Sequence, residues 1–266
     1  MESFLQYIVT NYTEISKNIK DPVLNTWLFM DSPTYMLCIY ITYLIFVLKV
    51  GPKMMEKRPA FQLRTIMILH NMIQVFFSIG ITSMGLNIII KMFSDEYNSL
   101  YDTEIKYTGL TSGWWYFFGK LTELLDTIFF VLRKKQDQVS FLHIYHHSIT
   151  VIFSWYCLKY LPGEQTIVVF TLNSAVHIIM YSYYFIAALG SKYKKYLWWK
   201  KCVTQSQLIQ FGIWLIYEVL IIIFPNILTM ECRTPKFLTY LLILKAIIFI
   251  YLFSDFYRKK YKTKTA

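Results

Sequence analysis

Three histidines within one short segment are the residues of this sequence best suited to chemistry. His143, His146 and His147 form a His-x-x-His-His pattern and are three of the five histidines in the chain. In an α-helix, offsets of three and four residues place all three imidazoles on one face. Imidazole can act as a metal ligand, a general base or a nucleophile. The segment therefore predicts a catalytic or metal-binding site, because packing alone would not need three imidazoles together.

Further polar residues recur at helical spacing inside apolar segments. A charged side chain in a membrane span costs free energy, so its presence there indicates function by default. Candidates of this kind occur on four segments: Lys120, Glu123, Asp126 and Thr127; Asn173, His177, Met180, Tyr181 and Tyr184; Thr204, Gln207 and Gln210; His70 and Asn71. Glu218 and Lys245 are isolated in the sequence, and their pattern assigns them no role.

The composition indicates that membrane-spanning helices position these residues. Of the 266 residues, 56% are hydrophobic and only 16% are charged, and the mean hydropathy is +0.40. Crossing a bilayer takes roughly 20 apolar residues in a helix. We expect an all-α membrane protein with seven spans: Pro33 to Val50, Thr65 to Ile90, Gly113 to Leu132, Phe141 to Tyr160, Thr166 to Leu189, Cys202 to Phe224 and Lys236 to Phe253.

The distribution of charge predicts the orientation of these spans. Lys and Arg gather in the connections after the first, third, fifth and seventh segments, and cytosolic loops collect such residues. We therefore expect a lumenal N-terminus and a cytosolic C-terminus. The polar candidates would then all lie in the cytosolic half of the bundle. The net charge of +11 is a signal of topology and of attraction to anionic lipid, and it does not indicate nucleic-acid binding.

This orientation divides the chain into a lumenal segment (residues 1–32), a membrane domain (33–256) and a basic cytosolic tail (257–266). Asn11 begins a glycosylation sequon on the lumenal side. The residues from Lys262 to Ala266 resemble a dilysine signal for retrieval to the endoplasmic reticulum, although a basic solvated tail would look the same. Cys157 and Cys232 both fall toward the lumen and are either buried free thiols or a pair.

Two kinds of chemistry fit the histidine cluster. Membrane di-iron desaturases and hydroxylases also use His-x-x-His-His, but they need several such boxes, and this chain has one box and five histidines in all. Without a metal, an imidazole can attack a thioester and form an acyl-imidazole, which is activated for onward transfer. Neighbouring acids and amides could fix the imidazole tautomers and stabilise oxyanions. The ligand count favours acyl transfer.

The polar segments together resemble the ELO family of very-long-chain fatty-acid elongases, the 3-oxoacyl-CoA synthases of the endoplasmic reticulum. The family motifs match Lys120 to Thr127, His143 to His147, Asn173 to Tyr184, and Thr204 to Gln210, in order along the chain. The aromatic segment Gly113 to Phe118 resembles animal members. One departure is His70, where the family more often has Tyr, and we expect this extra imidazole to be incidental.

The resemblance implies seven helices, six of them forming an inverted barrel around an acyl tunnel. It implies condensation of a long-chain acyl-CoA with malonyl-CoA, with release of CO2 and CoA, to give a 3-oxoacyl-CoA two carbons longer. His146 would attack the thioester, His177 would assist at the carbonyl or enolate, and His143 and His147 would orient. No cofactor or metal is expected. Partners would be the endoplasmic reticulum membrane and, in addition, other enzymes of the elongation cycle or a second copy of the chain.

Seven helices with an outside N-terminus also describe retinal proteins and receptors. Lys245 lies in the middle of the last predicted span, and the third carries carboxylates, as a Schiff-base lysine with counter-ions would require. That alternative leaves the histidine box and the glutamines without a role. The short loops give a receptor-like function no support.

Overall fold

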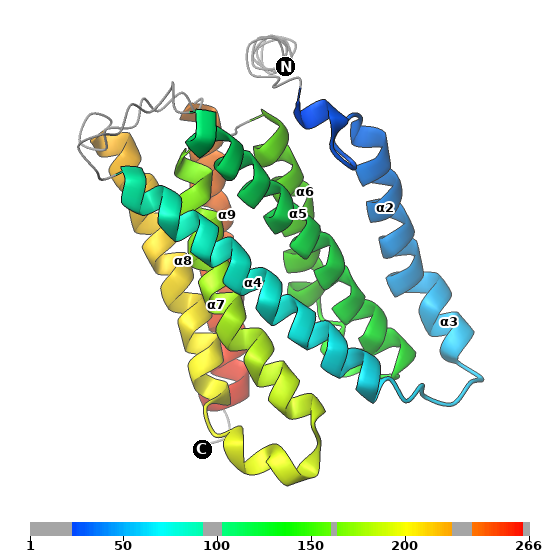
Figure 1. The fold of residues 1–266 in the computed structure, drawn as a ribbon. Helices are drawn as coiled ribbons and strands as arrows, with labels where there is room; N and C mark the ends of the chain where they lie inside the picture. The colour runs from blue at the N-terminus through cyan, green and yellow to red at the C-terminus, as the bar shows by residue number, and fades with distance from the viewer. Residues whose placement is uncertain (1–22, 93–102, 161–163, 225–235, 263–266) are drawn as a thin grey trace, which may run out of the picture.

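The computed structural model describes residues 23–92, 103–160, 164–224 and 236–262. Within these ranges the chain forms helices and turns, and no strand occurs (Figure 1). The sequon at Asn11, Cys232 and the last residues of the basic tail lie outside the described residues.

The long helices of the described residues follow the predicted apolar segments. Short 3-10 helices cover Leu24–Thr26, Gln136–Gln138 and Ser191–Tyr196. The longer elements are α2 (Pro33–Ile45), which continues through a π-helical turn (Phe46–Val50) into α3 (Gly51–Met55), α4 (Arg64–Met92), α5 (Thr103–Leu132), α6 (Phe141–Tyr160), α7 (Glu164–Ala188), α8 (Lys200–Ile223) and α9 (Lys236–Tyr257), which ends in a second π-helical turn (Arg258–Lys262).

The observed helices extend well beyond the predicted spans at three places, one of them the end of α9, which passes Phe253 and reaches Tyr257 and a further turn to Lys262. Helix α5 begins at Thr103, whereas the sequence predicts its span from Gly113. The first predicted span ends at Val50, but the helix continues to Met55. Pro52 lies in the first turn of α3, where its missing N–H costs least, and the wider π-helical turn directly before it keeps the chain helical.

Five helical stretches among the described residues are long and apolar enough to cross a membrane. They are Pro33–Met55, Arg64–Met92, Thr166–Ala188, Lys200–Ile223 and Thr239–Tyr261. The two remaining long helices, α5 and α6, carry most of the ionisable candidates, which lower their apolar character. The prediction of an all-helical membrane protein is confirmed, and five of its seven expected spans meet this test.

Large apolar side chains cover the outer face of the bundle. On α8 they recur every three or four residues, so that they form one exposed stripe: Ile209, Ile213, Ile216, Leu220 and Ile223. Similar stripes occur on α4 and α9. In water such a surface would associate, whereas in a bilayer it contacts lipid chains at no cost. The chain is therefore a multi-pass membrane protein.

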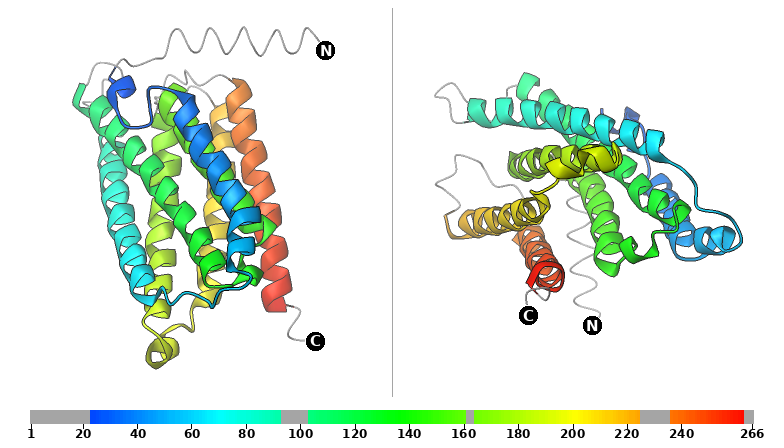
Figure 2. Two further views of the ribbon diagram at one scale, coloured as in Figure 1. Left: turned by 90° about the vertical axis from the view of Figure 1, so that its right-hand side faces the viewer. Right: turned by 90° about the horizontal axis from the view of Figure 1, so that it is seen from below.

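Six of the long helices pack in a continuous sequence of neighbours. Helix α4 contacts α5 and α7, α5 contacts α6, α7 contacts α8, α8 contacts α9, and α9 returns to α6. Helices α2 and α3 lie outside this group, against α5 and α6 (Figure 2). The candidate residues on α4 to α8 therefore face one another from neighbouring helices.

Close approach of α4 and α7 brings two of the candidate segments together. A side chain at Gly85 of α4 would overlap the hydroxyl of Thr171 on α7, so glycine permits this packing. At the other end of the pair, the Arg64 guanidinium donates to the backbone oxygens of Ala188 (3.1 Å) and Leu189. These donors satisfy carbonyls that the end of α7 leaves open, and they fix its position against the start of α4.

The segment that precedes α2 is tied to the far end of α6. Buried Lys159 donates to the Asn25 side chain (2.9 Å) and to the backbone oxygens of Met30 and Asp31. Trp155 Nε1 donates to the backbone oxygen of Phe29 (2.8 Å). These contacts hold α2 beside α6 although it lies outside the group of six.

Candidate active site

A buried carboxylate on α5 links two candidate residues of different helices. Lys120 Nζ donates to Glu123 Oε1 at 2.8 Å, and the same oxygen lies 3.0 Å from His177 Nδ1 on α7. Lys120 Nζ also lies 3.3 Å from both ring nitrogens of His177. Spacing of three residues on α5 and the packing of α5 against α7 produce this cluster. It fixes the position of His177 without substrate.

A second carboxylate, Asp126, connects α5 with α4 and α7. The Tyr181 hydroxyl donates to Asp126 Oδ2 at 2.7 Å, and His70 Nε2 lies 3.1 Å from Oδ1. The Tyr181 ring packs 5.7 Å from the His177 ring, centroid to centroid. The imidazole of His70, which was expected to be incidental, thus lies against one of the candidate acids. Asn71, the next residue, is also buried.

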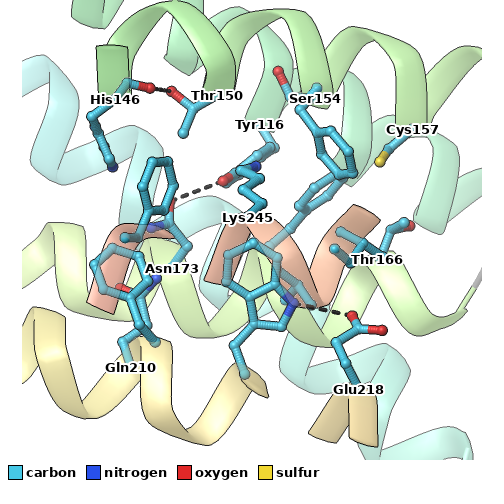
Figure 3. Close-up of a pocket in the computed structure, with 17 residues that line it drawn as sticks. Tyr116, His146, Thr150, Ser154, Cys157, Thr166, Asn173, Gln210, Glu218 and Lys245 are labelled. Carbon is cyan, nitrogen blue, oxygen red and sulfur yellow. Dashed lines mark hydrogen bonds between the residues drawn. The ribbon is translucent and has the colours of Figure 1, made fainter. Parts of the chain in front are cut away.

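The histidine box faces two different environments. His143 Nε2 lies 3.0 Å from Thr127 Oγ1 on α5, and its ring is 4.3 Å from the His147 ring, centroid to centroid. His146 instead packs against α9, with its ring 5.0 Å from Phe249. The box is thus divided, since His143 contacts α5 and packs against His147. His146 instead lines a cavity (Figure 3).

This larger cavity lies between α6, α7, α8 and α9, with Tyr116 of α5 in its wall, and has an empty volume of about 510 Å³. Its aromatic lining is broken by polar groups. Near His146 these include Asn173, whose Oδ1 accepts a hydrogen bond from the Tyr116 hydroxyl at 2.9 Å, and Gln210. Among the described residues, no side chain hydrogen-bonds to the His146 ring. Its nitrogens are therefore available to a molecule in the cavity.

The cavity extends along α6 away from His146. The remaining residues that line it are Thr150, Phe153, Ser154, Cys157, Thr166, Val169, Phe170, Phe211, Trp214, Glu218, Leu242, Lys245 and Phe249. Cys157 is a buried free thiol. Away from His146, aromatic and aliphatic side chains form much of the wall, and Glu218 and Lys245 interrupt them.

A smaller cavity of about 220 Å³ adjoins the Lys120, Glu123 and His177 cluster. It also contains Gln74, whose amide donates to Thr122 Oγ1 at 2.7 Å. Tyr116 lines both cavities. The site therefore has two chambers on either side of one tyrosine, with His146 in the larger and His177 in the smaller.

Ten predicted site residues line neither cavity; besides the six described above, they are Met180, Tyr184, Thr204 and Gln207. Gln207 Nε2 on α8 lies 3.3 Å from the Met180 sulfur on α7, and Thr204 is buried nearby on α8. Tyr184 is 41% exposed and packs edge-on against Tyr181. These residues, as the structure places them, pack α7 against its neighbours.

Sequence reasoning missed several residues of the site. Tyr43 of α2 donates from its hydroxyl to Thr127 Oγ1 at 2.9 Å and so completes the contacts of His143. Nothing in the apolar α2 segment signals this role. Tyr116 could have been found four residues before Lys120, on the same face of α5. Gln74 follows His70 by the same interval.

Two other interpretations of the site, a metal centre and a retinal protein with Lys245 as its Schiff-base lysine, can be compared with this geometry. Among the described residues, no group of three or more His, Cys, Asp or Glu side chains is arranged to hold a metal ion. Lys245 packs against aromatic rings, while the carboxylates of α5 contact Lys120, His177, His70 and Tyr181 instead. The α5 carboxylates, which were the expected counter-ions of a retinal Schiff base, thus already have other partners.

Comparison with known proteins defines the class to which this fold and site belong. The model of the ELO family, described as the GNS1/SUR4 family, matches residues 28–266. The chain belongs to this family.

Similar proteins from several animals are named very long chain fatty acid elongases. The chain is 37% identical to very long chain fatty acid elongase 7 of Drosophila melanogaster, over 97% of this chain and 78% of the relative. It is 39% identical to very long chain fatty acid elongase 4 of Homo sapiens, over 92% and 77%. For elongase 5 of Xenopus tropicalis the identity is 34%, over 98% and 87%. Family membership supports a role in very-long-chain fatty-acid elongation and confirms the resemblance seen in the motifs.

Proposed function

We propose that this chain is the condensing enzyme of fatty-acid elongation. It joins a long-chain acyl-CoA to malonyl-CoA, releases CO2 and CoA, and gives a 3-oxoacyl-CoA two carbons longer. The observation that carries the proposal is the position of His146, whose ring opens into a long, largely apolar cavity without a hydrogen bond from any described side chain.

In the first step, a nitrogen of His146 attacks the thioester carbonyl of the acyl-CoA. The carbon–sulfur bond breaks, CoA leaves as its thiol, and the acyl group remains on the imidazole. The tail of the acyl group occupies the larger cavity, against Phe153, Phe211 and Phe249. Asn173 and Gln210 lie close enough to the same end of the cavity to bind polar atoms of the thioester.

In the second step, malonyl-CoA loses CO2 and the resulting enolate attacks the acyl-imidazole carbon. This forms the new carbon–carbon bond and returns His146 to its free state. His177 serves at the enolate, because Glu123 and Lys120 already hold it at the smaller cavity. A positioned imidazole of this kind stabilises charge that develops during the reaction. His143 and His147 orient the box from the α5 side.

The membrane arrangement that accompanies this function has seven spans, including α5 and α6. Helix α6 has 20 residues and α5 has 30, and both suffice for about 30 Å of hydrocarbon. The six neighbouring helices α4 to α9 form the inverted barrel. In the endoplasmic reticulum the N-terminus faces the lumen, and the polar site opens to cytosolic acyl-CoA and malonyl-CoA without a further cofactor. Other enzymes of the elongation cycle, or a second copy of the chain, bind from outside the site.

The test is extension of an acyl-CoA series by microsomes that express the chain, with labelled malonyl-CoA. Replacing His146→Ala should lower extension by about a thousandfold or more and abolish the labelled acyl adduct on the protein. Phe141→Leu, on the exposed start of the same helix, is the control and should behave like the unchanged protein. Absence of product at every chain length would refute the proposed reaction, and an adduct that survives in His146→Ala would remove His146 as nucleophile.

A further inference from the structure

Two charged residues lie in the part of the larger cavity where the proposed reaction needs no charge. Lys245 of α9 and Glu218 of α8 both line the wall (Figure 3). Trp214 contacts both of them. On α6, Phe153 lies seven residues beyond His146, about 10 Å along the helix, and Lys245 Nζ is 4.1 Å from the centroid of the Phe153 ring. The charges are therefore well removed from the reacting carbon, alongside the hydrocarbon tail.

The surroundings of Lys245 leave its ammonium group incompletely satisfied. Its Nζ lies 4.1 Å from the Phe153 ring centroid, 5.2 Å from Trp214 and 5.7 Å from Phe249. No described residue forms a hydrogen bond or ion pair with it. Contacts with ring faces stabilise a cation, but they offer no oxygen to its three N–H donors. A ligand with an acceptor atom would complete this environment.

Glu218 determines what kind of acceptor fits. It is fully buried, and its Oε1 accepts a hydrogen bond from Trp214 Nε1 at 3.0 Å. The Trp214 ring that contacts Lys245 is thus held by Glu218. A second carboxylate brought in by a ligand would meet the negative charge of Glu218 in a low-dielectric site. A hydroxyl group adds no charge, accepts a hydrogen bond from an ammonium, and can donate to an acceptor.

We propose that this part of the cavity recognises a hydroxyl group on the acyl chain, remote from the thioester, and that Lys245 donates the hydrogen bond that selects it. The inference rests on the proposed function, which places the acyl tail in this cavity. Phe153 and Trp214 pack against the methylene groups on either side. An unsubstituted hydrocarbon tail offers the ammonium no hydrogen-bond acceptor. A hydroxyl at the right carbon offers one. The chain therefore prefers hydroxylated acyl-CoAs to unsubstituted ones of the same length.

The experiment uses pairs of saturated acyl-CoAs of equal carbon number, with and without a hydroxyl. The hydroxyl is moved along the tail one carbon at a time. Microsomes that express the full chain extend each pair in competition, with labelled malonyl-CoA. A hydrogen bond to a charged group predicts a preference of about tenfold or more for the hydroxylated chain, confined to a few adjacent positions.

Two substitutions and one control assign the preference to this site. Lys245→Met keeps the length of the side chain and removes its donors, so the preference should fall to near unity. Glu218→Gln removes the negative charge and should raise extension of a chain that ends in a carboxylate relative to the unchanged protein. Leu244→Met changes a neighbouring residue that is 52% exposed on the outer face of α9, and should leave the ratio as it was.

The outcomes separate this inference from the proposed function. No preference at any hydroxyl position, a preference that survives in Lys245→Met, or a carboxylate that is favoured over a hydroxyl would each overturn it. Binding of the same acyl-CoA pairs to the purified full chain is measured in parallel. If no acyl-CoA is extended at all, the proposed function fails, and the affinity ratio of each pair still decides whether Lys245 selects a hydroxyl.

Discussion

The His177 and His146 rings, one at each of the two cavities beside Tyr116, have opposite surroundings. Around the smaller cavity, Lys120, Glu123 and His177 are in contact with one another, and only the second carboxylate oxygen of Glu123 is buried without a partner among the described residues. Around the larger cavity, the His146 ring and the Lys245 ammonium contact aromatic rings, and neither forms a hydrogen bond with a described side chain.

This difference separates groups that the protein fixes in advance from groups whose partners come with a substrate. A charge that is held by its neighbours needs no reorganisation when negative charge develops beside it. A nucleophile must keep a free lone pair, so at least one nitrogen of the His146 ring must remain without a hydrogen-bond donor. We therefore expect substitutions at the two cavities to stop the reaction at different steps.

Replacing the two histidines in turn tests this difference between the cavities most directly. His146→Ala should lose both acyl transfer to the protein and chain extension. His177→Ala should retain the labelled acyl adduct but lower extension by about a hundredfold or more, because only the second step uses it. Quantifying adduct and product in the same samples checks this. Equal loss of the adduct in both variants would show that the histidines act together in one step.

The next largest effect is expected on stability. Glu123→Gln leaves Lys120 buried without an opposite charge, and breaking a buried pair in this way costs about 3 kcal/mol or more. Lys120→Met should destabilise as well, but the double variant should recover part of the loss because no isolated charge remains. Thermal unfolding of the detergent-purified variants measures both effects. Strictly additive losses would contradict the coupling between the two residues.

A smaller effect should follow from His70, which contacts Asp126 from α4. His70→Ala removes that contact but keeps the Tyr181 hydrogen bond to the same carboxylate, so extension should fall by roughly tenfold. His70→Gln retains a donor and should recover most of the rate. Leu69→Ala, at an exposed neighbouring position, is the matched control. If His70→Ala behaved like that control, Asp126 would need only Tyr181.

The sequence predicted this architecture where the signal is local. Runs of apolar residues predicted each long helix, and polar residues at intervals of three and four on α5 and α7 predicted that Lys120, Glu123 and His177 belong to one site. The rotation of a helix about its axis is set by its neighbours, and for that reason Tyr184 was expected in the site but lies outside both cavities.

The spacing of residues in the sequence could not predict contacts between distant segments. Tyr116 bonds to Asn173, and Tyr43 bonds to Thr127 across 84 positions of the chain. In a sequence that is 19% aromatic, no spacing distinguishes Tyr43 from the tyrosines that face lipid. Only the packing of α2 against its neighbours identifies it.

The smallest effect on extension is expected from Tyr43, which belongs to the groups that the protein holds in place without substrate. Its hydroxyl donates to Thr127 Oγ1, which in turn faces His143 Nε2 at 3.0 Å. Tyr43→Phe removes one hydrogen bond and little volume, so it should slow extension about threefold while the acyl adduct still forms. Tyr35→Phe, on the exposed face of the same helix, should have no effect. The rates of Tyr43→Phe, Thr127→Val and the double variant complete the test. If Tyr43 acts through Thr127, the double variant is no slower than Thr127→Val alone, whereas an additive loss would give Tyr43 a separate role.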